Sequence, residues 1–123
     1  MTEIAFFFDS YAIIEIIKGN TAYNKYRNAT IITTKLNLFE VYQALLELAG
    51  KEMADHFLEE SYPFRIGFDK EIIREAAAMR LKYKKRNISM ADCVGYILAK
   101  EYRVKFLTGD KEFEDFDPVE FVK

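Results

Sequence analysis

Residues 4–10 read IAFFFDS, so that five apolar residues run directly into an aspartate and a serine. A continuous apolar run of this length is typical of a strand in a parallel sheet that is covered on both faces, and it predicts a strand over residues 3–8. Functional groups in an open parallel sheet collect beyond the carboxyl ends of its strands. We therefore expect Asp9 to lie at a functional edge of the sheet.

The rest of the chain alternates between short apolar runs and helical patterns. Residues 31–34 and 104–107 are expected to form two further strands, and the alternating tail at residues 119–122 an edge strand. Helical patterns occupy residues 10–18, 36–49, 51–60, 70–85 and 90–102. This rhythm predicts an α/β fold in which helices cover both faces of a mainly parallel sheet.

Several of these helices carry signals at their ends. Gly19 and Gly50 stand where left-handed C-terminal caps are expected, and Asp69 and Ser89 are suitable N-caps. These signals support the predicted boundaries.

Two helices also carry a patterned face. The helix at 70–85 is expected to pack on the sheet through residues at helical spacing, Ile72, Ala76, Met79 and Tyr83. The helix at 90–102 has a stripe of small residues, Ala91, Gly95 and Ala99. We expect this stripe to let the helix backbone approach the sheet or another helix closely.

Length and composition limit what the chain can be. Its 123 residues and 50% hydrophobic content suit one compact domain, residues 1–123. The net charge of −2 supplies no overall positive field, so any binding of nucleic acid has to be local. A single cysteine and a single histidine argue against an internal disulfide and a zinc site. The opening apolar run is too short to span a bilayer and does not resemble a signal peptide, so we expect a cytoplasmic protein with no membrane contact.

Four carboxylates are the most informative side chains: Asp9, Glu40, Asp92 and Asp110. Each follows a predicted strand or lies in the first turns of a predicted helix. If the fold brings them together, their charges repel one another, and a divalent cation is their natural partner. The sequence thus suggests a small metal-dependent nuclease.

Each of these acids also has an ordinary structural interpretation. Asp9 and Asp110 could be turn or capping residues, and Asp92 could close a capping box with Ser89. Glu40 lies on a polar helix stripe with Asn37, Gln43 and Glu47. That stripe is either solvated or lines a pocket, and Glu47 is a competing acid.

Four motifs in chain order resemble the PIN-domain family of small ribonucleases, most closely its VapC-type toxins. They are FFFDS at 6–10, TKLNLFEVYQAL at 34–45, ISMADCVGYILA at 88–99 and FLTGDKEF at 106–113. The resemblance covers nearly the whole chain. It implies a three-layer sandwich with a mainly parallel, twisted sheet of four to five strands between helices.

The resemblance also implies roles for individual residues. The catalytic acids, which would bind Mg²⁺ or Mn²⁺, are Asp9, Glu40, Asp92 and Asp110. Ser10 and Thr108 would be neighbouring hydroxyls that orient carboxylates, water or substrate, and Glu112 is a further acid of the last motif. Hard oxygen ligands of this kind suit Mg²⁺ or Mn²⁺, which can assist hydrolysis of a phosphodiester. The number of metal ions stays open.

The implied activity is that of an endoribonuclease, and the implied partners are RNA, a cognate antitoxin protein and a second copy of the chain. The resemblance places the partner-facing surface on the N-terminal half, where four tyrosines gather: Tyr11, Tyr23, Tyr26 and Tyr42. We expect the isolated chain to expose apolar surface.

An acidic site repels RNA, so basic residues are needed to hold the RNA backbone. The candidates are Lys84, Lys85, Arg86 and Lys111. The run at 84–86 could instead complement the negative end of a helix dipole. A loss of salt dependence on substituting these residues would distinguish the two interpretations.

Two other classes of enzyme with a strand-terminal aspartate fit this sequence poorly. A haloacid-dehalogenase-like phosphatase needs a second aspartate two residues after the first, where Tyr11 stands, and a response-regulator receiver needs an acidic pair that is missing. A non-catalytic PIN-fold binding module and a housekeeping RNA-processing nuclease both stay open.

Overall fold

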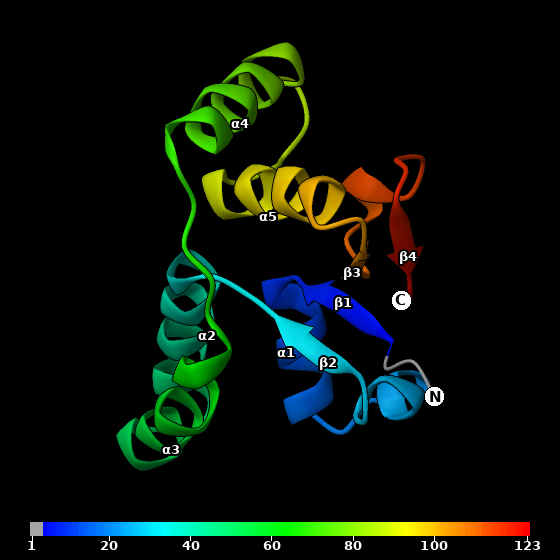
Figure 1. Cartoon of the computed structure of the whole chain (residues 1–123). Coiled ribbons are helices and arrows are strands. Elements are labelled where there is room, and N and C mark those ends of the chain that lie inside the picture. Colours follow the sequence, from blue (N-terminus) through cyan, green and yellow to red (C-terminus); the bar gives the residue numbers. More distant parts are fainter. Residues whose placement is uncertain (1–3) are drawn as a thin grey trace.

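A parallel sheet of four strands lies at the centre of the computed structural model, which describes residues 4–123 (Figure 1). The strands are β1 (Ala5–Phe8), β2 (Thr30–Ile32), β3 (Lys105–Thr108) and β4 (Val119–Phe121), in the order β2-β1-β3-β4. All three pairings are parallel. The predicted α/β fold and its edge strand are confirmed, although residue 3 of the predicted first strand lies outside the described residues.

The five predicted helices are all present, and three short 3₁₀ helices lie in the connections between elements. The α-helices are α1 (Ser10–Ile17), α2 (Lys35–Leu48), α3 (Lys51–Ser61), α4 (Lys70–Lys82) and α5 (Met90–Glu101). The 3₁₀ helices are η1 (Thr21–Tyr26), η2 (Tyr62–Phe64) and η3 (Lys111–Phe113). Gly19 and Gly50 have φ values of 83° and 94°, as expected for left-handed positions that favour glycine.

Helix α4 ends earlier than the predicted residue 85. Tyr83 leaves the helical region, with φ −106° and ψ 32°, and the chain then turns back toward α5. The run of basic residues that follows therefore lies on a turn and not on a helix. Both predicted N-caps are confirmed, because the side chains of Asp69 and Ser89 accept backbone N–H groups of the helices that they begin.

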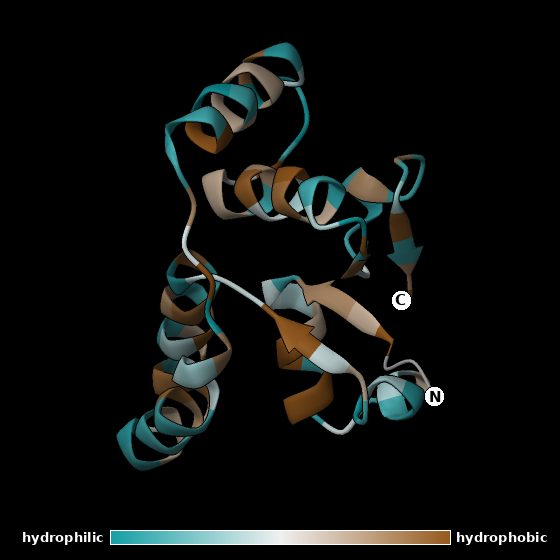
Figure 2. Cartoon of the chain, in the orientation of Figure 1, coloured by the Kyte–Doolittle hydropathy of each residue, from teal (hydrophilic) through white to brown (hydrophobic). Residues whose placement is uncertain are grey.

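Helices cover both faces of the sheet and give three layers. One face contributes Phe7 and Phe106 to a core shared with α5 and α4. The other contributes Phe8 and Leu107 to a core shared with α1, η1 and α2. Alternation of side chains along β1 thus buries Phe7 and Phe8 on opposite faces, as predicted for a strand covered on both sides. In Figure 2 the middle of α5 is hydrophobic, whereas α3 and α4 carry many hydrophilic residues.

The packing of α4 differs from its prediction. Its apolar face packs mainly on α5, which itself packs on β1 and β3. Ile72, Ala76 and Met79 are buried as expected, but against a helix and not against the sheet. The helical spacing reveals which face is buried and contains no information about the element that covers it.

The small-residue stripe of α5 permits the close approach that was predicted. A Cβ atom added to Gly95 would lie 2.5 Å from Cε1 of Phe7 and 3.0 Å from Cε1 of Phe106. Only glycine fits at this point, because both rings belong to strands at the centre of the sheet. No helix of residues 4–123 is both long enough and apolar enough to cross a membrane.

Candidate functional site

The carboxyl edge of the sheet brings the predicted acids toward one another. β1 and β3 are neighbours, and the backbone N–H of Asp9 donates to the carbonyl of Leu107 at 3.1 Å. Asp9 begins α1, and Asp110 begins η3 two residues after β3. Glu40 comes from the second turn of α2, and Asp92 from the first turn of α5. Figure 1 shows β1 and β2 pointing toward the start of α2.

Asp9 is held rigidly at the end of the central strand. Its side chain is buried, with 2% of its surface exposed. Its Oδ1 accepts the backbone N–H of Ser10 at 2.8 Å, and its Oδ2 accepts the hydroxyl of Thr108 at 2.8 Å. The Thr108 hydroxyl also accepts the backbone N–H of Asp110 at 3.1 Å. One hydroxyl on β3 therefore fixes both aspartates relative to each other.

Glu40 joins the site through Ser10. The Ser10 hydroxyl donates to Oε1 of Glu40 at 2.6 Å and accepts Nδ2 of Asn37 at 3.0 Å. Oδ1 of Asn37 in turn accepts the Thr34 hydroxyl at 2.7 Å. This chain of hydrogen bonds ties α2 to α1 and orients the Glu40 carboxylate. A buried polar group normally has such a partner.

Asn37 is a site residue that the sequence left among the ordinary polar positions of α2. It is fully buried, whereas Gln43 and Glu47 of the same predicted stripe are exposed. The solvated interpretation is right for those two residues, and the competing acid Glu47 lies outside the site. The available signal was spacing, because Asn37 and Glu40 lie three residues apart on one helix face.

Asp92 forms the capping box that its spacing predicts. Its Oδ2 accepts the backbone N–H of Ser89 at 2.8 Å, while the Ser89 hydroxyl accepts the N–H of Asp92 at 3.0 Å. The cap occupies one carboxylate oxygen. The charges of Glu40 and Asp110 also act on Asp92.

Electrostatics link the four acids into one group. Burial raises the pKa of Asp9 well above its usual range, the charge of Asp92 raises it further and Glu40 adds to the effect, against the hydrogen bonds from Thr108 and Ser10. Burial likewise raises the pKa of Asp92, as do the charges of Glu40 and Asp110, against the Ser89 hydrogen bond. None of the four acids forms an ion pair with any residue from 4 to 123. Their negative charge is left without a protein counter-ion.

The donor set fits a hard divalent cation in its chemistry. All four side chains offer carboxylate oxygens, the ligands that Mg²⁺ and Mn²⁺ prefer. In the described part of the chain, however, no three acidic, histidine or cysteine side chains are arranged so that they could hold a metal ion as they stand.

Glu112 and Arg86 make structural contacts beside the site. Oε2 of Glu112 accepts the backbone N–H of Asn87 at 3.2 Å, and its carbonyl accepts Nη1 of Arg86 at 2.6 Å. The Arg86 guanidinium also pairs with Asp115 at 3.0 Å. These bonds fasten the turn after α4 to η3.

The remaining basic candidates are exposed, whereas two of the four tyrosines are buried. Lys84, Lys85 and Lys111 are exposed. Tyr23 and Tyr26 are buried in the core of the α1 face, so the prediction that they face a partner is wrong. Their hydroxyls donate to groups of the C-terminal strand region, Val122 and Glu120, which the sequence could not reveal.

Comparison with known proteins decides the family. The PIN domain family model matches residues 6–118. The chain belongs to the PIN domain family. A search of the curated proteins found no match. Among solved structures, a chain described as "Toxin-antitoxin complex from Klebsiella pneumoniae" matches with a TM-score of 0.72 and 18% sequence identity, over 94% of this chain and 95% of that chain. At this identity the likeness shows that the two chains share a fold.

Proposed function

We propose that this PIN domain is a metal-dependent endoribonuclease and the toxin of a VapC-type toxin–antitoxin pair. The observation that carries the proposal is the group of four carboxylates, drawn from four segments of the chain, which act on one another electrostatically and have no counter-ion within residues 4–123. PIN domains are generally nucleases, and the structural neighbour comes from a toxin–antitoxin complex.

Asp9, Glu40, Asp92 and Asp110 would hold Mg²⁺ or Mn²⁺. A bound divalent ion lowers the pKa of an attacking water and stabilises the negative charge that builds on the phosphate. Thr108 and Ser10 position Asp9 and Glu40 through the hydrogen bonds described above. Asn37 holds the Ser10 hydroxyl and is thus a positioning residue. The exposed lysines 84, 85 and 111 are the candidates for contacts with the RNA backbone.

The proposed antitoxin or second copy of the chain would bind on the outer side of α2 and α3. Large apolar side chains are exposed there, namely Phe39, Leu46, Leu48 and Met53. Phe39 is 70% exposed and Leu48 is 65% exposed, so this surface is well suited to be covered by a partner. We also propose that the protein acts in the cytoplasm.

A non-catalytic binding module is the second candidate. One observation favours it: among the described residues, no three acidic, histidine or cysteine side chains form a group that could hold a metal ion. Buried acids that repel one another destabilise a fold, however, and a purely architectural role offers no reason to gather them.

Cleavage of RNA separates the two candidates. We would incubate the purified chain with a pool of structured RNAs in Mg²⁺ or Mn²⁺, with and without chelator. Glu40→Gln and Asp92→Asn are expected to abolish cleavage, as is the chelator. The matched control is Glu47→Gln, which changes an exposed acid on the same helix as Glu40 and should cleave like the wild type. Cleavage that survives chelation or both site variants would contradict the proposal.

A further inference from the structure

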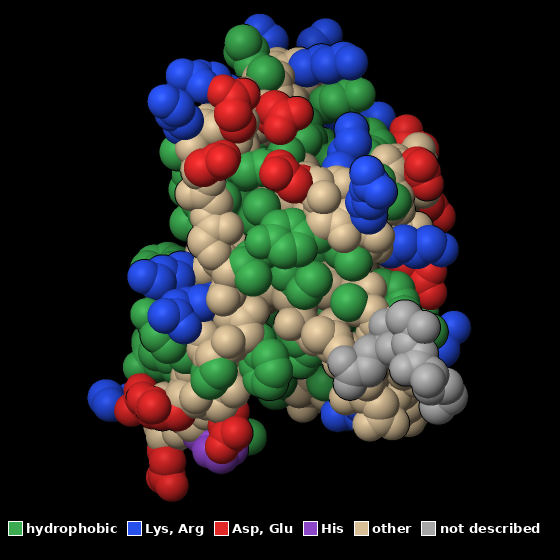
Figure 3. Space-filling model, in the orientation of Figure 1, with side chains coloured by type: hydrophobic (Ala, Val, Ile, Leu, Met, Phe, Trp, Pro, Cys, Tyr) green, Lys and Arg blue, Asp and Glu red, His purple; other side chains and the backbone are tan. Residues whose placement is uncertain are grey.

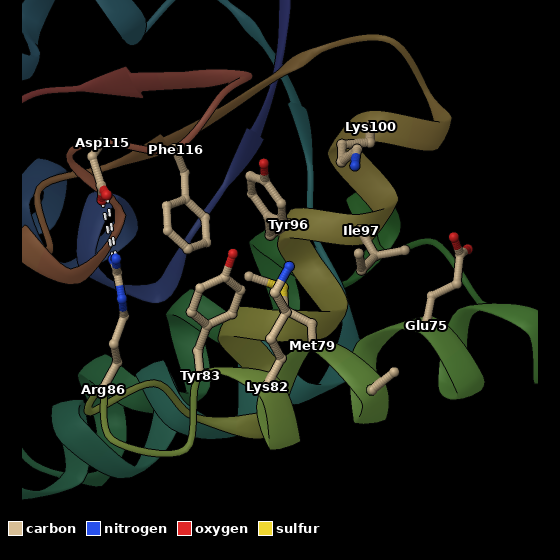
Figure 4. A pocket seen from close by; sticks show the side chains of 11 residues that line it. Glu75, Met79, Lys82, Tyr83, Arg86, Tyr96, Ile97, Lys100, Asp115 and Phe116 are labelled. Atoms are coloured by element: carbon tan, nitrogen blue, oxygen red, sulfur yellow. Dashed lines mark hydrogen bonds and ion pairs between the residues drawn. The ribbon is translucent and has the colours of Figure 1, made fainter.

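A pocket of about 590 Å³ opens between α4, α5 and the turn at Asp115 and Phe116, and none of the four acids lines it (Figure 4). Figure 4 shows Lys82 and Tyr83 projecting from the end of α4 toward Tyr96 and Ile97 of α5. The pocket therefore lies outside the proposed catalytic site. Its lining combines rings, cations and two acids in a way that points to one kind of ligand.

Three aromatic rings form one side of this pocket. The centroid of the Phe116 ring lies 5.1 Å from that of Tyr83 and 5.5 Å from that of Tyr96. The Tyr96 hydroxyl donates to the carbonyl of Asp117, which fixes its ring in the core. Tyr83 and Phe116 are only half-buried, so part of their surface faces the open space. A planar ligand ring can stack on such a surface.

Cations lie over two of these rings. Nζ of Lys82 lies 5.3 Å from the centroid of Tyr83, and the Arg86 guanidinium carbon lies 4.7 Å from the centroid of Phe116. Arg86 is neutralised by Asp115, but Lys82 forms no ion pair within the described residues. This end of the pocket can accept a phosphate.

The opposite end of the pocket is different in charge. Lys100 lies there, 5.8 Å from the centroid of Tyr96, and an adjoining hollow is lined by Glu75, Lys100 and Glu101. The negative charges of these acids would repel a phosphate, whereas the Glu75 carboxylate can accept N–H groups from the edge of a base. The difference in charge between the two ends of the pocket thus favours one orientation of a bound ligand.

We propose that this pocket binds a nucleotide, with its phosphate at Lys82, its base against Tyr83 and Phe116, and the base edge toward Glu75. Stacking of bases on aromatic side chains, together with cations that track the phosphates, is how single-stranded nucleic acid is commonly held. The nucleotide can belong to an RNA strand or be free in solution. Only the RNA source rests on the proposed nuclease function.

Nucleotide binding can be measured without catalysis. We would titrate the full chain, in chelator, with the four ribonucleoside 5′-monophosphates and with a mixed-sequence oligoribonucleotide of eight residues, following backbone amides by NMR. Shifts are expected at Tyr83, Phe116 and Ile97. Tyr83→Leu, which keeps an apolar side chain, should weaken binding about tenfold because it removes one stacking ring. Lys82→Gln should weaken binding and lower the salt slope for the oligonucleotide by about 0.7.

Lys70→Gln is the matched control, because it changes an exposed lysine at the other end of α4 and should bind like the wild type. Thermal unfolding of each variant checks that it folds, and Lys82 is exposed, so its substitution should leave the fold intact. The inference is overturned if no monophosphate shifts these amides, or if Lys82→Gln and Tyr83→Leu bind as tightly as the control.

The two sources of the nucleotide give different results. An oligonucleotide that binds more than tenfold tighter than any monophosphate indicates an RNA strand, and Tyr83→Leu should then raise KM for RNA cleavage at unchanged kcat. Equal affinities indicate a free nucleotide. Failure of the proposed nuclease would appear as absent cleavage with these amide shifts intact, whereas failure of this inference would appear as cleavage with no such shifts.

Discussion

Asp9 is an ionisable side chain that is almost completely buried at the end of the central strand. Burial and the neighbouring charge of Asp92 raise its pKa well above 3.8, its ordinary value. Ionised Asp9 is therefore disfavoured in the folded chain relative to the unfolded one. The folded state loses stability as the pH rises from the unfolded pKa through the folded pKa, and the loss is complete above the folded pKa.

We predict that Asp9→Asn stabilises the metal-free chain at neutral pH. An asparagine can keep the bond from Ser10 through its oxygen and can donate to the Thr108 hydroxyl through its amide. The advantage should shrink as the pH falls toward 4, because Asp9 of the unfolded chain then becomes protonated as well. Urea unfolding in chelator between pH 4 and pH 8 measures this difference.

Asp55→Asn is the control, because the pKa of Asp55 is shifted in the opposite direction to that of Asp9. A hydrogen bond from Lys51 lowers the pKa of the Asp55 carboxyl, so its substitution should not stabilise the chain at neutral pH. An Asp9→Asn chain that is less stable than the wild type at neutral pH, or a difference that does not change with pH, would contradict the electrostatic interpretation.

Asn37 gives a second test at the residue scale. Asn37→Ala would leave the Thr34 and Ser10 hydroxyls without their buried partner, and unmade buried hydrogen bonds cost about 1–3 kcal/mol. We expect a loss of stability of this size, and a lower kcat for RNA cleavage because Glu40 loses its fixed orientation. Denaturant unfolding and steady-state cleavage measure the two effects.

Gln43→Ala, an exposed change on the same helix, should alter stability by less than about 0.5 kcal/mol and leave kcat unchanged. If Asn37→Ala behaved like this control, Asn37 would have no positioning role.

The polar contacts of the site differ in how far the sequence predicts them. The capping box of Ser89 and Asp92 is local, so a spacing of three residues was sufficient to predict it. The bond between Asn37 and Ser10 joins residues 27 apart, and it depends on how α2 packs against α1. The hydrophobic pattern shows which face of a helix is buried, but it does not show how α2 is positioned along α1. Asn37 was therefore missed even though Glu40, on the same face, was selected.

Close packing at Gly95 is the test at the scale of the elements. A methyl group there would meet the rings of Phe7 and Phe106, so Gly95→Ala should push α5 away from the sheet. Overpacking of a core costs about 1–3 kcal/mol, and we expect a loss of stability in that range. Because Asp92 lies on α5, the displacement should also weaken cleavage of RNA.

Gly67→Ala is the matched control, since nothing lies within 4 Å of a Cβ atom added to Gly67. Its unfolding midpoint in urea should stay within error of the wild type or rise slightly, because alanine restricts the unfolded chain. Equal effects of the two substitutions would show that α5 does not approach the sheet as described.

The order of elements was more predictable than their partners. The spacing of apolar residues identified the four strands and the five α-helices of the described chain, because strands and helices differ in this spacing. The end of α4 was predicted three residues too late, since Lys84, Lys85 and Arg86 are good helix formers and the turn at Tyr83 is set by contacts of Arg86 with Glu112 and Asp115. Those contacts span about a quarter of the chain and leave no local signal.

At the scale of the whole molecule, acidic and basic residues are nearly equal in number, whereas exposed apolar side chains gather on α2 and α3. Figure 3 shows charges of both signs spread over one face of the molecule, in keeping with a net charge of −2. No general field therefore draws in RNA, and local contacts have to hold it. The exposed apolar side chains of α2 and α3 are the surface that we expect a partner protein to cover.

We predict that Leu48→Ser with Met53→Ser weakens association of the chain with a second copy or with its antitoxin, without lowering its stability. Both side chains are more than half exposed, so the folded chain loses little by their removal. Sedimentation velocity over a range of concentrations measures self-association. Unchanged association with both partners would exclude this surface as an interface. Leu81→Ser, at an exposed leucine of α4, serves as the control.

The central claim is that the four carboxylates at the edge of the sheet form one divalent metal site. The most direct measurement is the melting temperature as Mg²⁺ or Mn²⁺ is added to the wild type and to the Asp9→Asn, Asp92→Asn double variant. A ligand at about 100 times its Kd stabilises a folded protein by about 2.7 kcal/mol. We expect the wild type to melt at a higher temperature with metal and the double variant to be unaffected. A melting temperature that metal does not change, or changes equally in both, would contradict the claim.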